Sequence, residues 1–448
     1  MKAVVPSRIA VRMYQVGFGD CLLLTLAYPT SVEDGRSERH VLFDFGTTSL
    51  PNGRKNLDHV ARSIGERTAG QLDAVVLTHR HRDHLSGFGR QAIADLLQSS
   101  APPTLVVRPW TEDPDADERF TGGESDAPGE ASLGFVRALR DADTFAAAAA
   151  ETIAPPGSQG LRRQLHMMAF DQVSNPAAVA QLDAWAKPDR GEYLHHGCPT
   201  RLESLLPGVR ITVLGPPTIE QHPTVTRMRD VDQEEFWMLY RRLGEGLGGD
   251  LRAELEAAAE EAIEDERRAL PSGPAQWLIE HLDRQQIGSY LRIVRILDDV
   301  LNNTSLILLF DIEGDGGTKR LLFCGDAQIE DWEFALKPPE DRAPLLDRLT
   351  EVDLYKVGHH GSRNATPRSL FNLWTGPGKG RNMVALMSTK DDVHGDSPAT
   401  KVPRATLVDA LRDRTDLFDT RSFDADQSFV EVSTDTASAD GFSESARG

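Results

Sequence analysis

Cysteine is scarce in this chain of 448 residues, which contains only Cys21, Cys198 and Cys324. These thiols are too few and too far apart in the sequence for a disulfide framework or a cysteine-rich zinc site. Such usage is typical of proteins from a reducing compartment, so we expect a cytoplasmic location.

Long apolar runs are also missing. No stretch approaches the roughly 18 uninterrupted apolar residues of a membrane span, and polar residues such as Arg8, Arg12 and Asp20 interrupt the first thirty positions. We therefore expect neither a membrane segment nor a signal peptide. A hydrophobic content of 40% with 26% charged residues is typical of a soluble globular protein.

Positive charge is in deficit, because 49 Lys and Arg residues face 69 Asp and Glu residues, a net charge of −20. Proteins that bind long nucleic acids usually present a basic face, since neutralising phosphates supplies much of the affinity. We therefore expect any anionic substrate to be small or threaded, and to be attracted by bound metals and a few local cations.

The most informative stretch that is present runs from Leu77 to Gly87 and includes His79, His81, Asp83 and His84. Imidazole and carboxylate ligands suit Zn²⁺, Mn²⁺ or Fe, whereas calcium prefers oxygen alone. His79 and His81 alternate on an extended segment, and Asp83 and His84 come where a helical pattern begins. The spacing favours two adjacent metals, one at each pair. A polar turn without metal is the competing interpretation.

Hydrophobic periodicity predicts an antiparallel β start, followed by alternating strands and helices. This order is typical of an α/β fold with two mixed β-sheets flanked by helices. Strands are predicted over 8–16, 21–26, 40–45, 73–77, 105–109, 209–214, 305–310, 320–324, 353–357, 383–387 and 428–432, and helices over 57–68, 85–98, 135–153 and 404–412.

The predicted core is interrupted by stretches with weaker or purely helical patterns. The helical block over 226–301 is interpreted either as a cap over the site or as a surface for a second copy or another protein partner. The expected divisions are 1–100 as the first half of the core, 101–208 as an irregular and helical insertion, 209–217 as a core strand, 218–301 as a helical insertion, 302–433 as the second half of the core and 434–448 as a disordered tail.

Polar residues recur directly after apolar strands. In an α/β sandwich such strand ends converge at one edge, so these residues can meet in one cleft. Two neighbouring metals need a bridging group, for which Asp326 is suited, and His359 or His360 would give the second metal another imidazole. The strand-end residues are Asp44, the cluster His79–His84, Asp326, His359 and His360.

Several motifs in one order along the chain resemble those of the ComEC-type branch of metallo-β-lactamase fold hydrolases, a branch named after the hydrolase domain of the competence protein. The resemblance covers about residues 1–100 and 300–432, with one further match in between. The motifs are Val16–Cys21, Val41–Gly46, Thr78–Gly87, Val209–Pro217, Asn303–Leu306, Leu322–Asp326 and Lys356–Ser362.

The resemblance implies a metallo-β-lactamase αβ/βα sandwich that binds two divalent ions, Zn or Mn. His79 and His81 would hold one metal, Asp83 and His84 would hold the other, and Asp326 would bridge the two.

The same resemblance implies roles for four further residues. Either His359 or His360 would complete the second metal site, while its neighbour would contact the substrate or the leaving group. Asp20 and Asp44 would lie behind the ligands and orient the histidines, as metal-binding imidazoles usually require.

One departure concerns the first metal, because most of the superfamily has a histidine where this chain has Asn302 and Asn303. An amide oxygen of either residue, or water, would fill that position and would favour Mn²⁺. His195, His196 and His222 are weaker candidates from the insertion.

These observations predict a metal-dependent hydrolase, with a phosphodiesterase or nuclease favoured. A hydroxide bridging the metals and oriented by Asp83 would attack a phosphodiester, nucleotide or single-stranded nucleic acid, and His359 or His360 would protonate the leaving group. A lactone, β-lactam or thioester hydrolase, or a metal-stabilised binding module of a defence or toxin pair, are the alternatives. Candidate substrate contacts are Arg80, Arg82, Ser362, Arg363 and His394, and Lys356 is a further cation near the motifs that supports an anionic substrate.

Overall fold

The structure is a computed structural model. It describes residues 4–93 except 33 and 91, 102–120, 128–140 except 138, 175–226, 235, 301–336, 343–375, 382–393, and 401–448 except 425. Apart from residues 226, 235 and 301, the helical block expected over 226–301 lies outside these residues. Among the described residues, no helix is both long and apolar enough to span a membrane.

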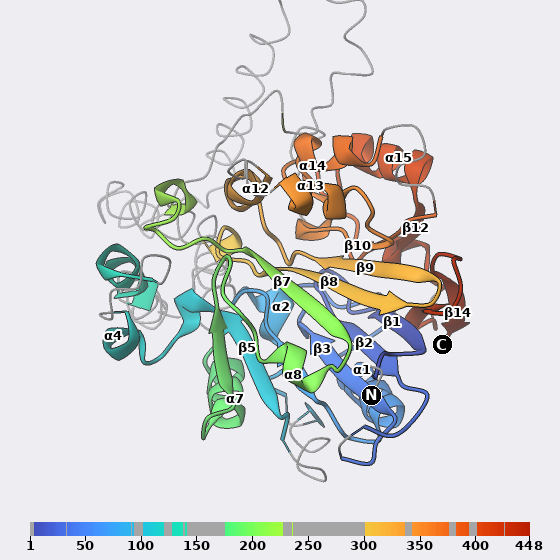
Figure 1. Ribbon diagram of the computed structural model, residues 1–448, viewed down its shortest axis with the longest axis horizontal. Helices are drawn as coiled ribbons and strands as arrows, with labels where there is room; N and C mark the ends of the chain where they lie inside the picture. The colour runs from blue at the N-terminus through green and yellow to red at the C-terminus, as the bar shows by residue number, and fades with distance from the viewer. Residues whose placement is uncertain are drawn as a thin grey trace, which may run out of the picture.

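Two mixed β-sheets form the centre of the fold (Figure 1). In the first sheet, pairing is antiparallel on the side that holds both chain ends and parallel on the other side. Its strands lie in the order β14 (Ser443–Arg447), β13 (Phe429–Asp435), β1 (Arg8–Tyr14), β2 (Leu22–Ala27), β3 (Glu38–Phe43), β4 (Ala74–Val76), β5 (Leu105–Pro109) and β6 (Gly191–Leu194).

The second sheet has the same mixed character. Its last three strands in the order below pair antiparallel, and the others pair parallel, so both sheets present carboxyl ends of parallel strands. The order is β12 (Asp416–Asp419), β11 (Val384–Met387), β10 (Leu354–Lys356), β9 (Gly317–Phe323), β8 (Ile307–Gly314) and β7 (Val209–Gly215).

Helices cover the outer faces of the two sheets, which gives the layers helix, sheet, sheet and helix (Figure 1). The first sheet packs against α1 (Asp58–Thr68), α2 (Arg82–Leu85) and α7 (Pro176–Ala186), and the second against α12 (Ile329–Leu336), α13 (Ala343–Leu349), α14 (Arg368–Leu373) and α15 (Ala405–Arg414). Short helices α4 (Ala116–Arg119) and α8 (Leu202–Leu205) lie in connections. The mixed α/β class with two mixed sheets is as predicted.

The strands are apolar on both faces because both faces are covered. Leu22 and Leu24 of β2 point into the core between the sheets, whereas Leu23 packs toward α1 on the outer face. Sheets buried on both sides read as nearly continuous apolar runs. This explains why β2 and β8 showed apolar stretches without alternation.

An aromatic contact joins the sheets behind the strand ends. Phe43 of β3 stacks on Phe323 of β9 with 4.2 Å between ring centroids, and Phe310 of β8 meets Phe43 edge-on at 5.9 Å. Phe43 directly precedes Asp44, and Phe323 lies three residues before Asp326. The aromatic stack therefore sets the separation of the two halves of the candidate site.

Two expectations about the chain divisions are wrong. Residues 434–448 are not a disordered tail, because Ser443–Arg447 forms β14 against β13 and the neighbouring Phe442 is buried. The side chains of β14 are polar and mostly exposed, so the sequence shows no apolar pattern that predicts a strand. The strand forms because its backbone pairs with that of β13. Part of 101–208 belongs to the core, because β5 and β6 extend the first sheet and α7 covers it.

We predict that Phe323→Ala lowers the free energy of unfolding by about 3–5 kcal/mol, because it leaves a cavity in the contact between the sheets. Urea unfolding followed by circular dichroism measures this. The control is Val4→Ala at a side chain that is 41% exposed, for which we expect a change below about 0.5 kcal/mol. Equal effects of the two substitutions would contradict the prediction.

Candidate metal centre

The cluster His79–His84 begins three residues after β4 ends and continues into α2. His81 has extended backbone angles directly before the helix, while Asp83 and His84 lie in its first turn. The change from extended chain to helix separates the two pairs, as the spacing predicted. His79 and His81 therefore face one part of the centre, and Asp83 and His84 face another.

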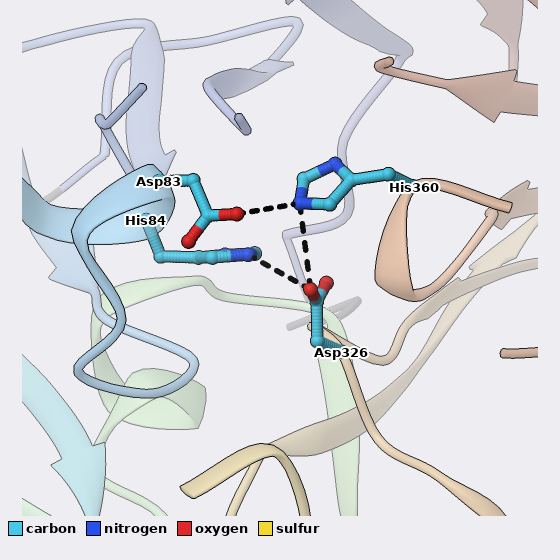
Figure 2. A group of neighbouring side chains, drawn as sticks. All are labelled: Asp83, His84, Asp326 and His360. Atoms are coloured by element: carbon cyan, nitrogen blue, oxygen red, sulfur yellow. Dashed lines mark hydrogen bonds and ion pairs between the residues drawn. The ribbon is translucent and has the colours of Figure 1, made fainter. Parts of the chain in front are cut away.

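Asp83, His84, Asp326 and His360 bring their ligand atoms within 4.8 Å of one another (Figure 2). His360 Nε2 lies 3.0 Å from Asp83 Oδ2 and 3.4 Å from Asp326 Oδ2. His84 Nε2 lies 3.2 Å from the same Asp326 oxygen. Two nitrogens and two carboxylates from three separate segments thus converge, and we call these four residues the second group. They could hold a metal ion.

The other ring nitrogens of the two imidazoles show that this set fits a metal. His360 Nδ1 lies 2.9 Å from the carbonyl oxygen of Ser388, so it carries the proton and donates it. His84 Nδ1 lies 2.8 Å from Asp44 Oδ2. Both imidazoles therefore turn Nε2 toward the carboxylates of the centre, where a metal ion could take the place of the protons. Outer partners of this kind are typical of metal-bound histidines.

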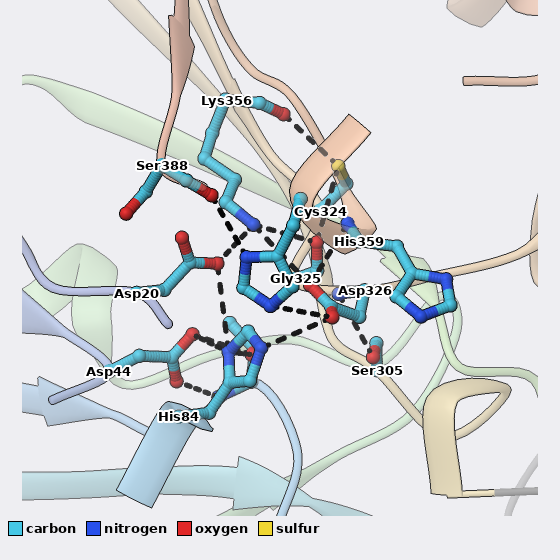
Figure 3. A network of polar contacts seen from close by, with 12 residues as sticks. Asp20, Asp44, His84, Ser305, Cys324, Gly325, Asp326, Lys356, His359 and Ser388 are labelled. Atoms are coloured by element: carbon cyan, nitrogen blue, oxygen red, sulfur yellow. Dashed lines mark hydrogen bonds and ion pairs between the residues drawn. The ribbon is translucent and has the colours of Figure 1, made fainter. Parts of the chain in front are cut away.

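Asp44 lies beside His84 and orients this part of the centre (Figure 3). Its Oδ1 accepts the backbone N–H of Thr78 at 2.8 Å, and its Oδ2 accepts the Thr78 hydroxyl at 2.7 Å as well as facing His84. Asp44 has a φ of 52°, a left-handed conformation that is uncommon outside glycine. The expected role of Asp44 as an orienting residue agrees with these contacts.

Two motif glycines allow the backbones around the cluster to approach closely. A Cβ atom at Gly46 would lie 2.5 Å from the backbone nitrogen of His84, and one at Gly19 would lie 2.7 Å from the backbone oxygen of Asp83. Any side chain at either position would therefore push the cluster away from β3 and from the turn before β2.

The pair His359 and His360 lies in the short 3₁₀ turn η6 (His359–Gly361), where both residues have positive φ, 41° and 51°. This conformation sends the side chains in different directions. His360 joins the second group and packs against Phe18 in a tilted arrangement, with 4.3 Å between ring centroids. His359 instead donates its backbone N–H to Asp326 Oδ1 at 2.9 Å, and its ring Nδ1 is buried without a hydrogen-bond partner.

His79, His81 and Asn302 lie together in a separate cluster. We call it the first group, because its histidines come first in the sequence. His79 Nε2 lies 3.0 Å from His81 Nδ1, which lies 3.1 Å from the amide oxygen of Asn302. Of the two asparagines proposed for this position, Asn302 therefore contacts a histidine of the cluster, and Asn303 is buried beside it. Two sets of His, Cys, Asp and Glu side chains among the described residues could hold a metal ion, the second group and the set Asp20, Asp44 and His84. Neither of them includes the insertion residues His195, His196 or His222.

The neighbouring histidines keep the carboxyl group of Asp326 ionised, the form that binds a cation. Burial would raise the pKa of Asp326, but His84 and His360 hold it well below its usual value. Burial would lower the pKa of His84, but Asp326 and Asp44 raise it well above its usual value. Burial, together with the neighbouring His84 and His81, lowers the pKa of His79 well below the usual value. His79 is therefore neutral, as a metal ligand must be.

The residues proposed to contact substrate have varied surroundings. Arg80 lies 3.7 Å from Glu112, and the buried Ser362 donates its hydroxyl to Asn364 at 2.8 Å. Arg82 and Arg363 belong to the segments that carry the ligands, and His394 lies outside the described residues. Lys356 is not open to substrate, because it is buried beside Asp20 and Asp326.

Ser388 and Thr78 were missed as parts of the centre. Ser388 directly follows β11, so the same strand-end reasoning that found Asp326 could have included it. Its contribution is a backbone carbonyl, however, which no side-chain pattern reveals.

No protein-family model matches the chain, and a search of curated proteins finds none with significant similarity.

We predict that the protein purified without added metal carries close to two divalent ions per chain and that Asp326→Ala lowers this content, because Asp326 faces both histidines of the second group. Mass spectrometry of metals measures it. The control is Asp347→Ala, at an exposed carboxylate on α13, which should leave the content unchanged. Equal metal content in the two variants would show that Asp326 is not a ligand.

Proposed function

We propose that the protein is a binuclear metal-dependent hydrolase of the metallo-β-lactamase fold, ComEC-type branch, and that it cleaves phosphodiesters. The observation that carries the proposal is the convergence of Asp83, His84, Asp326 and His360 within 4.8 Å. Purely structural ion pairs do not require two imidazoles whose outer nitrogens are both engaged and whose inner nitrogens face shared carboxylates.

The second group would hold one ion, and the first group, His79, His81 and Asn302, would hold the other. Divalent ions there would act as Lewis acids and lower the pKa of water toward neutrality, which supplies a nucleophile at physiological pH. Nitrogen and oxygen donors without thiolate suit Zn²⁺ or Mn²⁺. The amide oxygen of Asn302 would shift the metal preference of the first group toward Mn²⁺.

The residues of the chain would perform the remaining steps. Asp83 is the carboxylate of the second group with the greatest exposure, 14% for its side chain, so it is placed to orient an incoming nucleophile. The Nδ1 atom of His359 is a ring nitrogen without a hydrogen-bond partner in the turn that carries His360. His359 Nδ1 would form a hydrogen bond with the leaving-group oxygen and protonate it.

The choice of a phosphodiester is supported by the motif resemblance and by charge. The net charge of −20 opposes binding of long duplexes. A nucleotide or a single strand that reaches the metals at one point avoids most of this repulsion. The proposed substrate is therefore small or single-stranded.

We predict metal-dependent cleavage of bis(p-nitrophenyl) phosphate, and we expect the Asp83→Ala/His84→Ala double variant to show only the background rate because it removes half of the second group. Release of p-nitrophenol measures the rate, with Asp347→Ala as the matched control. Cleavage that survives the double change would rule out this centre. Faster turnover of lactones, β-lactams or thioesters would keep the centre but reject the phosphodiester.

A second prediction concerns the first group. Asn302→Ala should weaken Mn²⁺ binding, whereas Asn302→His should favour Zn²⁺ over Mn²⁺ by roughly tenfold, because imidazole replaces a harder oxygen donor. Titration calorimetry with each metal measures the two affinities. Asn303→Ala is the matched control, and a larger effect there than at Asn302 would assign the ligand to Asn303.

A further inference from the structure

Lys356 lies at the end of β10 and is only 3% exposed. Its ammonium pairs with Asp20 Oδ2, lies 3.1 Å from the carbonyl oxygen of Gly325 and lies 3.4 Å from Asp326 Oδ1 (Figure 3). An ammonium has three N–H donors, so these three acceptors account for all of them. Lys356 therefore acts inside the centre and has no donor left for a substrate.

The two oxygens of Asp326 face different partners. Oδ1 receives the backbone N–H of His359 at 2.9 Å and the ammonium of Lys356 at 3.4 Å. Oδ2 faces the Nε2 atoms of His84 and His360 at 3.2 and 3.4 Å. Because the terminal torsion of an aspartate is broad, a carboxylate keeps one oxygen directed at a site only when partners fix the other.

We propose that Lys356 is a positioning residue, whose ammonium holds Asp326 so that Oδ2 is presented to the metal of the second group. The inference rests on the proposed metal centre and extends it to a residue that touches neither metal nor substrate. Lys356 also links the two halves of the chain, since Asp20 belongs to the turn before β2 and Asp326 follows β9.

A simpler role must be separated from this one. Asp20 is fully buried, and a buried carboxylate without a cation is costly, so Lys356 could serve only to neutralise Asp20. Removing Lys356 alone would weaken the protein under either explanation. Removing both charges distinguishes them, because a neutral pair needs no compensation while Asp326 still loses its partner.

The experiment compares Asp20→Asn/Lys356→Met with Asp20→Asn alone. Titration calorimetry with Mn²⁺ gives the affinity, and thermal unfolding without metal gives the stability. Both variants lack the Asp20 carboxylate, which lies 3.7 Å from His84 Nδ1, so any contribution of Asp20 cancels when they are compared with each other. We expect the double variant to keep its fold and to bind Mn²⁺ about 10–100-fold more weakly than Asp20→Asn, the usual effect of losing a residue that orients a ligand.

An Mn²⁺ affinity of the double variant within about threefold of that of Asp20→Asn would overturn the assignment, because Lys356 would then contribute nothing beyond neutralising Asp20. A double variant that fails to fold would likewise overturn it, because Lys356 would then be needed for the fold itself. Wild-type protein that binds no Mn²⁺ would instead contradict the proposed metal centre, which is a distinguishable result.

Discussion

The contacts of Asp326 with His84 and His360 join the two sheets at the candidate centre, and the surrounding structure is arranged to permit them. A buried carboxylate is tolerated only when partners at hydrogen-bond distance replace its water. Such distances require the ends of β4, β9 and β10 to be fixed to within a fraction of an ångström. The stack of Phe43 on Phe323 and the backbone hydrogen bond from Leu306 to Thr78 supply that rigidity directly behind the charges.

Backbone strain near the centre has the same origin. Asp44, His359 and His360 all adopt positive φ values, which cost free energy in non-glycine residues and persist only where surrounding contacts over-determine them. Each of the three is held by contacts of its own, Asp44 by Thr78, His359 by Asp326 and His360 by Ser388. The strain directs one imidazole of the pair to the second group and leaves the other beside it.

The sequence predicted those features that depend on residue type and spacing, namely the two mixed sheets, the division of the cluster at His81 and the position of Asp326 at a strand end. It left open the choice between His359 and His360, because that choice depends on backbone angles in one turn. Lys356 was interpreted as a cation for substrate, since a motif does not reveal burial. The strand β14 was missed because polar edge strands pair through their backbone.

Under the proposed function, the charges of the centre would explain how an acidic protein favours both a metal and an anionic substrate. Asp20, Asp44 and Asp326 are buried, Asp83 is partly buried, and Lys356 is the buried ammonium that pairs within this set. Four carboxylates face one ammonium, and without metal the imidazole of His84, whose pKa Asp326 and Asp44 raise, balances part of the remaining negative charge. A divalent cation could take the place of that proton. Under the proposed function, bound cations would reverse the local potential of the centre while the chain as a whole stays acidic. A phosphate would then be attracted at the centre, whereas the net negative charge would oppose a long duplex.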